Sequence, residues 1–198
     1  MNHSLFFSRH IKKLFAVILL GISLSGCIPI ALIVGATAGG AVVYDKRSTV
    51  TMAQDQESGE VAGKLMKQSS DLAGTHIVIA MFNHIMLLAG QTNTAAQRTT
   101  ADQIATSVKN VSRVYNEISI RKPTSSWQRS RDAWITTKIK TEMLTKSGLH
   151  STQIKVVTED GVVYLMGELT PHQAELATNI ARRADGVKEV VKVFENQQ

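Results

Sequence analysis

Residues 154–194 read IKVVTEDGVVYLMGELTPHQAELATNIARRADGVKEVVKVF. The stretch begins with a β-branched run from Ile154 to Thr158, and a second apolar run follows from Val162 to Met166. Between the two runs stands Asp160–Gly161, a pair typical of a tight turn between antiparallel strands. This part of the chain therefore predicts a β-hairpin that closes at Gly167.

A helix and a third strand are predicted after the hairpin. Thr170 is suited to the N-cap of the helix, and Pro171 is suited to its first position. Gln173 lies three residues after the cap, where its side chain can accept a hydrogen bond from the backbone N–H of Thr170. Small or apolar residues then recur at three- and four-residue steps and give the helix one apolar face: Ala174, Ala177, Ile180, Ala181 and Ala184. Gly186 is expected to end the helix, and the valine-rich segment up to Phe194 predicts the strand.

The same pattern occurs once earlier in the chain. Residues 85–90 match residues 162–167 with a spacing of 77, and residues 110–111 match residues 186–187 with a spacing of 76. We therefore expect an α+β protein with two tandem copies of one αββαβ unit. Each copy has a mixed three-stranded sheet and two helices, the first at residues 46–122 and the second at residues 123–198.

Copy one departs from copy two at its first helix and at its hairpin turn. The helix is predicted within residues 45–70, with Val61, Leu65 and Met66 on its apolar side. Asn83–His84 stands where copy two has Asp160–Gly161. Because histidine adopts a positive φ less readily than glycine, this turn is expected to differ in shape.

Gly90 and Gly167 each close a predicted strand. We expect that a side chain at either position would disturb the approach of a helix and destabilise its domain.

The amino-terminal residues have the pattern of an export signal. Three cations, Arg9, Lys12 and Lys13, precede an apolar core, and residues 24–27 read LSGC. Leucine, two small residues and cysteine match the bacterial lipoprotein signal, so residues 1–26 are predicted to be removed and Cys27, the only cysteine, to carry the lipid as a thioether. Ile28 after the cysteine indicates sorting to the outer membrane.

Two interpretations remain open for the apolar residues 28–43. In one, residues 27–45 are a lipidated tether at the membrane surface. In the other, they extend residues 14–24 into one membrane span, with Gly35 and Gly39 as a close-packing pair.

The net charge argues against nucleic acid as a partner. Arg9, Lys12 and Lys13 account for three of the +6 charges, so removal of the signal leaves +3 on the mature chain. The high isoelectric point therefore overstates the basicity, and an exported protein rarely meets nucleic acid.

The first helix of copy two, predicted over residues 130–146, holds the most informative surface. At 100° per residue, Ile135, Ile139 and Met143 share the side toward the sheet, and Trp134 lies about 140° from its centre. Four further residues lie away from the core on this wheel: Arg131, Lys138, Thr141 and Leu144. A tryptophan and cations on one surface suit the headgroup region of an anionic membrane. The alternative is that Trp134 packs over the domain edge and that the cations are a solvated face.

The repeat resembles the BON domain of bacterial envelope proteins. The resemblance rests on residues 134–138 (WITTK), 163–167 (VYLMG), 114–118 (VYNEI) and 186–190 (GVKEV). Two such units after a lipoprotein signal resemble dual-BON outer-membrane lipoproteins of the DolP type. That resemblance implies a lipid-anchored protein that faces the periplasm, binds anionic phospholipid, gathers at division sites and supports outer-membrane integrity. It places the lipid contact on the first helix of copy two, at Trp134, Ile135, Lys138 and Leu144.

Catalysis is not indicated by any motif. The mature chain has four histidines, none at metal-ligand spacing, and no nucleophile elbow, phosphate loop or zinc-protease motif. We expect no cofactor, no metal and no small-molecule substrate. Two hypotheses for the function follow: a module that binds anionic phospholipid, or a protein-interaction module that docks on an envelope machine such as the β-barrel assembly complex.

Overall fold

A computed structural model describes residues 47–196, which lie within one compact unit, Val43–Gln198. The predicted signal, Cys27 and the tether lie outside the described residues. The first domain runs α2 (Thr49–Gln68), η1 (Ser70–Leu72), β1 (His76–Phe82), β2 (Ile85–Thr92), α3 (Ala95–Ser107) and β3 (Arg113–Ile120). The second runs α4 (Ser126–Thr145), η2 (Ser151–Gln153), β4 (Ile154–Glu159), β5 (Val162–Leu169), α5 (Pro171–Arg183) and β6 (Glu189–Asn196).

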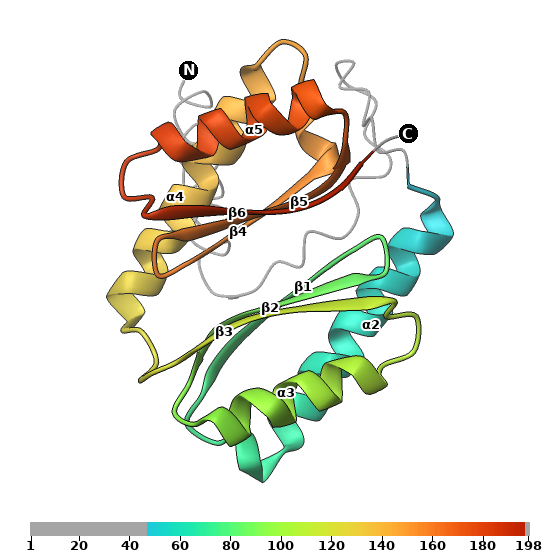
Figure 1. Cartoon of the computed structure of the whole chain (residues 1–198), viewed down its shortest axis with the longest axis vertical. Coiled ribbons are helices and arrows are strands. Elements are labelled where there is room, and N and C mark those ends of the chain that lie inside the picture. The colour runs from blue at the N-terminus through green and yellow to red at the C-terminus, as the bar shows by residue number, and fades with distance from the viewer. Residues whose placement is uncertain (1–46, 197–198) are drawn as a thin grey trace, which may run out of the picture. The chain divides into compact units, whose positions relative to one another are not determined.

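Both domains have the same sheet topology. The strand orders are β1-β2-β3 and β4-β5-β6; in each sheet the hairpin is antiparallel and the last strand is parallel to its neighbour. A parallel third strand requires a crossover, which α3 and α5 supply. In Figure 1 the helices of each domain cover one face of its sheet, and the other faces of the two sheets are turned toward each other. The predicted α+β fold with two αββαβ units is confirmed.

Three hydrophobic clusters follow from this layering. One lies between α4, α5 and their sheet, and a second lies between α2, α3 and theirs. The third fills the space between the two sheets. Its buried members are Ala80, Phe82, Ile85, Leu87 and Ala89 from the first domain and Tyr164, Met166 and Val193 from the second. Each strand of the two hairpins thus contributes alternate residues to a helix-facing core and to a core that both domains share.

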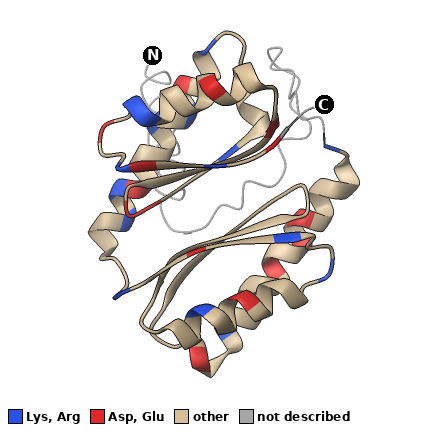
Figure 2. Cartoon of the chain, in the orientation of Figure 1, with Lys and Arg blue, Asp and Glu red and all other residues tan. Residues whose placement is uncertain are grey.

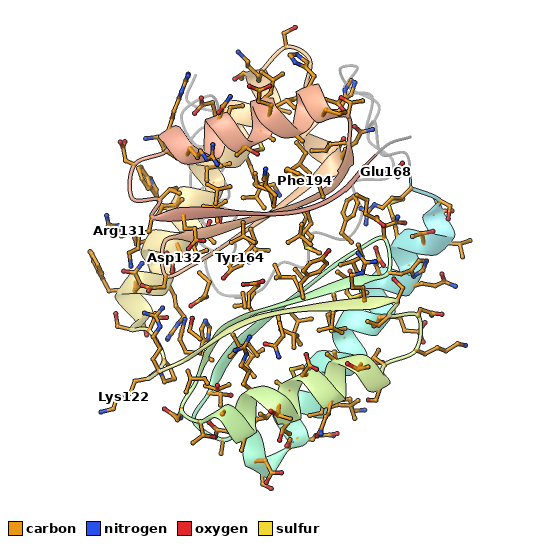
Figure 3. All side chains as sticks on the ribbon, in the orientation of Figure 1. Lys122, Arg131, Asp132, Tyr164, Glu168 and Phe194 are labelled. Carbon is orange, nitrogen blue, oxygen red and sulfur yellow. The ribbon has the colours of Figure 1, made fainter. Side chains whose placement is uncertain are left out.

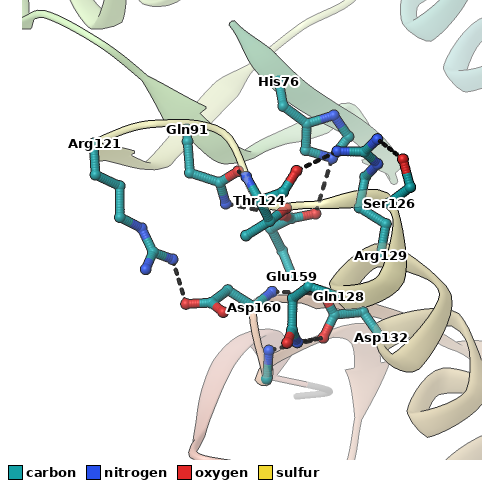
Figure 4. A network of polar contacts seen from close by, with 11 residues as sticks. His76, Gln91, Arg121, Thr124, Ser126, Gln128, Arg129, Asp132, Glu159 and Asp160 are labelled. Atoms are coloured by element: carbon teal, nitrogen blue, oxygen red, sulfur yellow. Dashed lines mark hydrogen bonds and ion pairs between the residues drawn. The ribbon is translucent and has the colours of Figure 1, made fainter.

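Polar contacts border the shared core (Figure 4). Glu159 is buried, and it accepts hydrogen bonds from Gln91 Nε2 at 2.8 Å and Thr124 Oγ1 at 3.3 Å. His76 Nε2 lies 3.3 Å from the same carboxylate, and Arg121 pairs with Asp160 beside it. The linker between the domains therefore takes part in holding the two sheets together.

The two hairpin turns have the same shape, so the expectation of a different first turn was wrong. Asn83 and His84 have φ values of 50° and 65°, and Asp160 and Gly161 have 49° and 78°. A buried aspartate holds each turn. Asp55 accepts from the N–H groups of Asn83 and His84 at 2.7 and 2.8 Å.

Asp132 repeats this arrangement in the second domain. Its carboxylate accepts from the N–H groups of Asp160 and Gly161 at 2.8 and 2.9 Å. The two aspartates are 77 residues apart, the spacing of the repeat. Charge-assisted hydrogen bonds to both turn amides offset the cost of a positive φ at His84.

Of the three residues predicted for the apolar side of α2, Met66 is buried as expected, and Val61 and Leu65 are not. Val61 and Leu65 are 41% and 40% exposed, and Asp55, Ser58, Ala62 and Met66 are the buried positions. The pattern of apolar residues did not predict this face, because Asp55 and Ser58 are buried as hydrogen-bonded polar residues. The hydroxyl of Ser58 donates to the carbonyl of Lys109 at 2.9 Å.

Helix α4 begins at Ser126, four residues before the predicted start. Ser125 caps it by accepting from the N–H of Gln128 at 3.3 Å. The cap and the extra turn add Trp127 to this helix.

Gly90 and Gly167 close their strands, but the obstacle to a side chain is the neighbouring backbone and not a helix. A Cβ at Gly90 would lie 2.1 Å from the carbonyl oxygen of His76, and Gly90 has a φ of 119°. A Cβ at Gly167 would lie 2.7 Å from the carbonyl oxygen of Gln153. Gly186 follows α5 with a φ of 89° and suits the predicted role of helix stop.

Candidate functional site

One side of α4 is core and the opposite side is open to solvent. Ile135, Ile139 and Met143 are buried under the sheet, as the periodicity predicts. Trp134 is 56% exposed and Leu144 is 70% exposed. Thr141 is exposed as well. Large apolar side chains are left in water on a helix whose inner face is fully packed, so the domain core does not account for them.

Two tryptophan–cation pairs run along the exposed side of α4. The guanidinium of Arg131 lies 5.7 Å from the ring centroid of Trp127, and the ammonium of Lys138 lies 5.3 Å from that of Trp134. Each cation follows its tryptophan by four residues, and the two pairs are seven residues apart, so they share one stripe of the helix. We call Trp127, Arg131, Trp134, Lys138 and Thr141 the α4 stripe. In Figure 2 several Lys and Arg positions lie along α4.

Trp127 is the functional candidate that sequence reasoning missed. It is 69% exposed, more than Trp134. The available signals were its seven-residue distance from Trp134 and its four-residue distance from Arg131. They were overlooked because the helix was predicted to begin after Trp127.

Ile135 must be removed from the proposed lipid-contacting residues. Its side chain is 1% exposed and belongs to the core cluster of the second domain. A side chain that α5 and the sheet cover has no surface left for a lipid, so its role is to hold α4 in place.

Lys138 already has an anionic partner in the protein. Its Nζ donates to Asp185 Oδ2 at 2.6 Å. This hydrogen bond, together with the charge of Lys138, holds the pKa of Asp185 below its usual value. Asp185 is 83% exposed, so a phosphate from solution can compete with it for Lys138.

A shallow hollow borders the stripe. It is lined by Trp134, Thr137, Lys138, Thr141, Glu142 and Thr145. The indole offers an apolar wall and the ammonium a positive charge to a ligand that has an anionic head. The hydroxyls of Thr137 and Thr145 already donate to backbone carbonyls of α4, and Glu142 adds a negative charge at the border of the hollow.

Other kinds of site are not seen in the described part. Residues 47–196 hold no group of three or more His, Cys, Asp or Glu side chains placed to bind a metal ion. Within the same residues, no helix combines the length and the apolar character that a membrane crossing requires.

Comparison with known proteins supplies the class. The BON domain model matches residues 58–122 and 131–197. The chain is 34% identical to outer membrane lipoprotein DolP of Haemophilus influenzae over 93% of this chain and 95% of that protein. It is 37% identical to a 21 kDa hemolysin of Actinobacillus pleuropneumoniae over 76% of this chain and 78% of that protein. It is 31% identical to osmotically-inducible protein Y of Escherichia coli over 61% of both chains.

The chain belongs to the BON-domain family and contains two BON domains. Its similarity to DolP over nearly the whole length supports, more particularly, an outer-membrane lipoprotein of the DolP kind. The same similarities point to an envelope protein without an enzymatic role.

Proposed function

We propose that the chain is a lipid-anchored outer-membrane protein that faces the periplasm and binds anionic phospholipid through the α4 stripe of its second domain. The observation that carries the proposal is the pair of exposed tryptophans, each with a cation one turn further along. Indole rings favour the headgroup boundary of a bilayer, and each cation near an anionic surface contributes about 1 kcal/mol.

The internal repeat supports the choice of the second domain. At the spacing of 77 residues, Trp127 and Trp134 correspond to Val50 and Glu57 on α2, and Lys138 corresponds to Val61. The first domain therefore has the same helix in the same place without either tryptophan–cation pair. The stripe is therefore not a requirement of the fold, which supports a role for it in binding.

The anchor and the stripe would act together. A lipid on Cys27 holds the second domain at the bilayer, so a weak contact through α4 is made at high local concentration. The contact then reports the lipid composition, which the acyl chains alone do not distinguish. In this proposal the protein supports outer-membrane integrity by gathering where anionic lipid is enriched, including division sites.

Vesicle flotation of residues 43–198, the compact unit without the anchor, tests the lipid contact. We expect binding to phosphatidylglycerol vesicles that salt weakens, and no binding to phosphatidylcholine. Trp134→Glu is expected to abolish binding with an unchanged circular dichroism spectrum, and Trp127→Glu to weaken it about tenfold or more. Val50→Glu is the matched control for Trp127→Glu, because it adds the same charge at the corresponding place on α2. Binding that survives Trp134→Glu would rule out the stripe.

A further inference from the structure

The first domain has a groove that the lipid proposal does not use, with apolar side chains on its helix and strand walls and Gln68, Ser69, Ser70 and Thr75 as polar lining. It lies between the carboxyl-terminal half of α2 and the strand β1, beside the η1 segment. Gly63, Met66 and Lys67 line it from the helix, and Ile77 and Ile79 line it from the strand. Lys67 is the only charged residue among those that line it.

The strand that borders this groove is an unprotected sheet edge. β1, β3, β4 and β6 are the edge strands of the two described sheets. The last three each carry both an acidic and a basic side chain, which discourages pairing with another chain. β1 reads HIVIAMF, and it has no Asp, Glu, Lys, Arg or Pro. An apolar edge strand without these safeguards is a template for a further strand.

Ile77 and Ile79 direct both their side chains and their backbone polar groups toward the groove side. Phe82 pairs with Ile85 across a two-residue turn, so Phe82, Ala80 and Val78 exchange hydrogen bonds with β2. The alternate residues Ile77, Ile79 and Met81 then present their N–H and C=O groups at the free edge. The carbonyl of Met81 agrees with this, because it accepts from Lys155 Nζ of the second domain at 3.1 Å. Lys155 therefore occupies the Met81 end of the edge, and Ile77 and Ile79 are the positions left for a further strand.

Gly63 lines the groove, and the packing of the first domain does not require a glycine at this position. A glycine inside a helix costs about 1 kcal/mol relative to alanine. A Cβ at Gly63 would lie 3.9 Å from Ile79 Cδ1, an ordinary contact, so the fold has room for a side chain. The corresponding residue of α4 is Lys140. The absence of a side chain at position 63 leaves the floor of the groove open beside the strand.

We propose that this groove binds an extended peptide segment of a partner protein, which adds as a strand to β1. Main-chain hydrogen bonds to Ile77 and Ile79 would supply affinity, and alternate apolar side chains of the peptide would enter the groove against Met66. Lys67 selects a segment with a carboxylate at the helix side. The site lies in the first domain and does not depend on the proposed lipid contact of α4.

The test uses the full-length protein in detergent and a phage-displayed library of random peptides about eight residues long, enough for one strand. We expect enrichment of peptides with apolar residues at alternate positions and an aspartate or glutamate. A selected peptide should slow amide hydrogen exchange at Ile77 and Ile79. Lys67→Glu should shift the preference from acidic to basic peptides, which a merely structural role of Lys67 would not produce.

Two variants separate the groove from the rest of α2. Gly63→Lys copies the second domain and should weaken the selected peptide at least about tenfold. Val61→Lys also copies the second domain, adds the same charge outside the groove and should leave affinity unchanged. The proposal is overturned by a library without enrichment, by equal binding to Gly63→Lys, or by unchanged exchange at Ile77 and Ile79. Dimers that form without peptide and dissociate on Gly63→Lys would assign the edge to a second copy instead.

Discussion

At the scale of single residues, Lys138, the cation beside Trp134, forms an ion pair with Asp185. The pair is exposed. A lipid phosphate must displace Asp185 or bind beside it, and the carboxylate is itself repelled by an anionic surface. The site is therefore weaker than its cations alone would make it.

Asp185→Asn should strengthen binding to phosphatidylglycerol vesicles roughly fivefold, because it frees Lys138 and removes one negative charge at the surface. The measurement is vesicle flotation at low salt. Asp71→Asn removes the same charge from η1 of the first domain and should change nothing. Equal effects of the two variants would mean that only net charge matters, and a loss on Asp185→Asn would mean that Asp185 contacts the ligand.

Gly90 is the position where a single methyl group should cost most. A Cβ there would lie 2.1 Å from the carbonyl oxygen of His76, and the φ of 119° is strained for any other residue. Gly90→Ala should lower the free energy of unfolding by about 3 kcal/mol, measured by chemical denaturation. Gly167→Ala meets its obstacle at 2.7 Å without a positive φ, so it should cost less. Equal costs would contradict this ranking.

At the scale of elements, each hairpin depends on a helix that precedes it. The carboxylates of Asp55 and Asp132 reach from α2 and α4 to both turn amides. The helix, the turn and the first two strands of each domain are therefore linked through one buried side chain. The two aspartates are 77 residues apart, as expected for equivalent positions of the repeat.

Asp132→Ala should leave the N–H groups of Asp160 and Gly161 without an acceptor and lower the free energy of unfolding by roughly 2–4 kcal/mol. Urea denaturation measures the loss. Glu142→Ala removes an exposed carboxylate from the same helix and should change stability by less than about 0.5 kcal/mol. If the two variants unfold at the same urea concentration, the hydrogen bonds to the turn are not important for stability.

At the scale of the whole molecule, the two domains share a core that neither could keep alone. Tyr164 lies in it, between the two sheets (Figure 3). Burial, with the charges of Glu117, Glu189 and Glu159, raises the pKa of Tyr164 to about 12. The folded state thus favours the neutral phenol more than the unfolded state does.

A pH above 10 should therefore destabilise the fold through Tyr164. The contribution of Tyr164 is fully present below its unfolded pKa near 10 and is lost as the pH rises toward 12. Between pH 10 and pH 12, the free energy of unfolding of the wild type should fall by roughly 1 kcal/mol more than that of Tyr164→Phe, which cannot ionise. Thermal melts from pH 8 to pH 12 give the comparison. Parallel curves for the two proteins would show that the shared core opens before Tyr164 ionises.

Much of the protein follows from sequence periodicity. The strand alternation, the Asp–Gly turn, the cap at Thr170 and the repeat spacing are local signals, and they sufficed for the two αββαβ units. The exposure of Trp134 and Leu144 also follows from helix geometry, because α4 is regular and one face carries three large apolar residues. A face defined by hydrogen-bonded polar residues, as on α2, has no such signal.

Only the tertiary structure decided the contacts between distant residues. The pairing of Lys138 with Asp185 spans 47 residues, and the clamp of Asp132 on Gly161 spans 29. The shared core, the obstacle at Gly90 and the free edge of β1 depend on which surfaces the two domains leave for each other. Local pattern determines an element, and also its inner face where that face is apolar, because both arise from neighbours along the chain. Which element covers an outer face is decided by tertiary packing. Contacts between two elements change the free energy of folding only when both elements have formed and lie against each other.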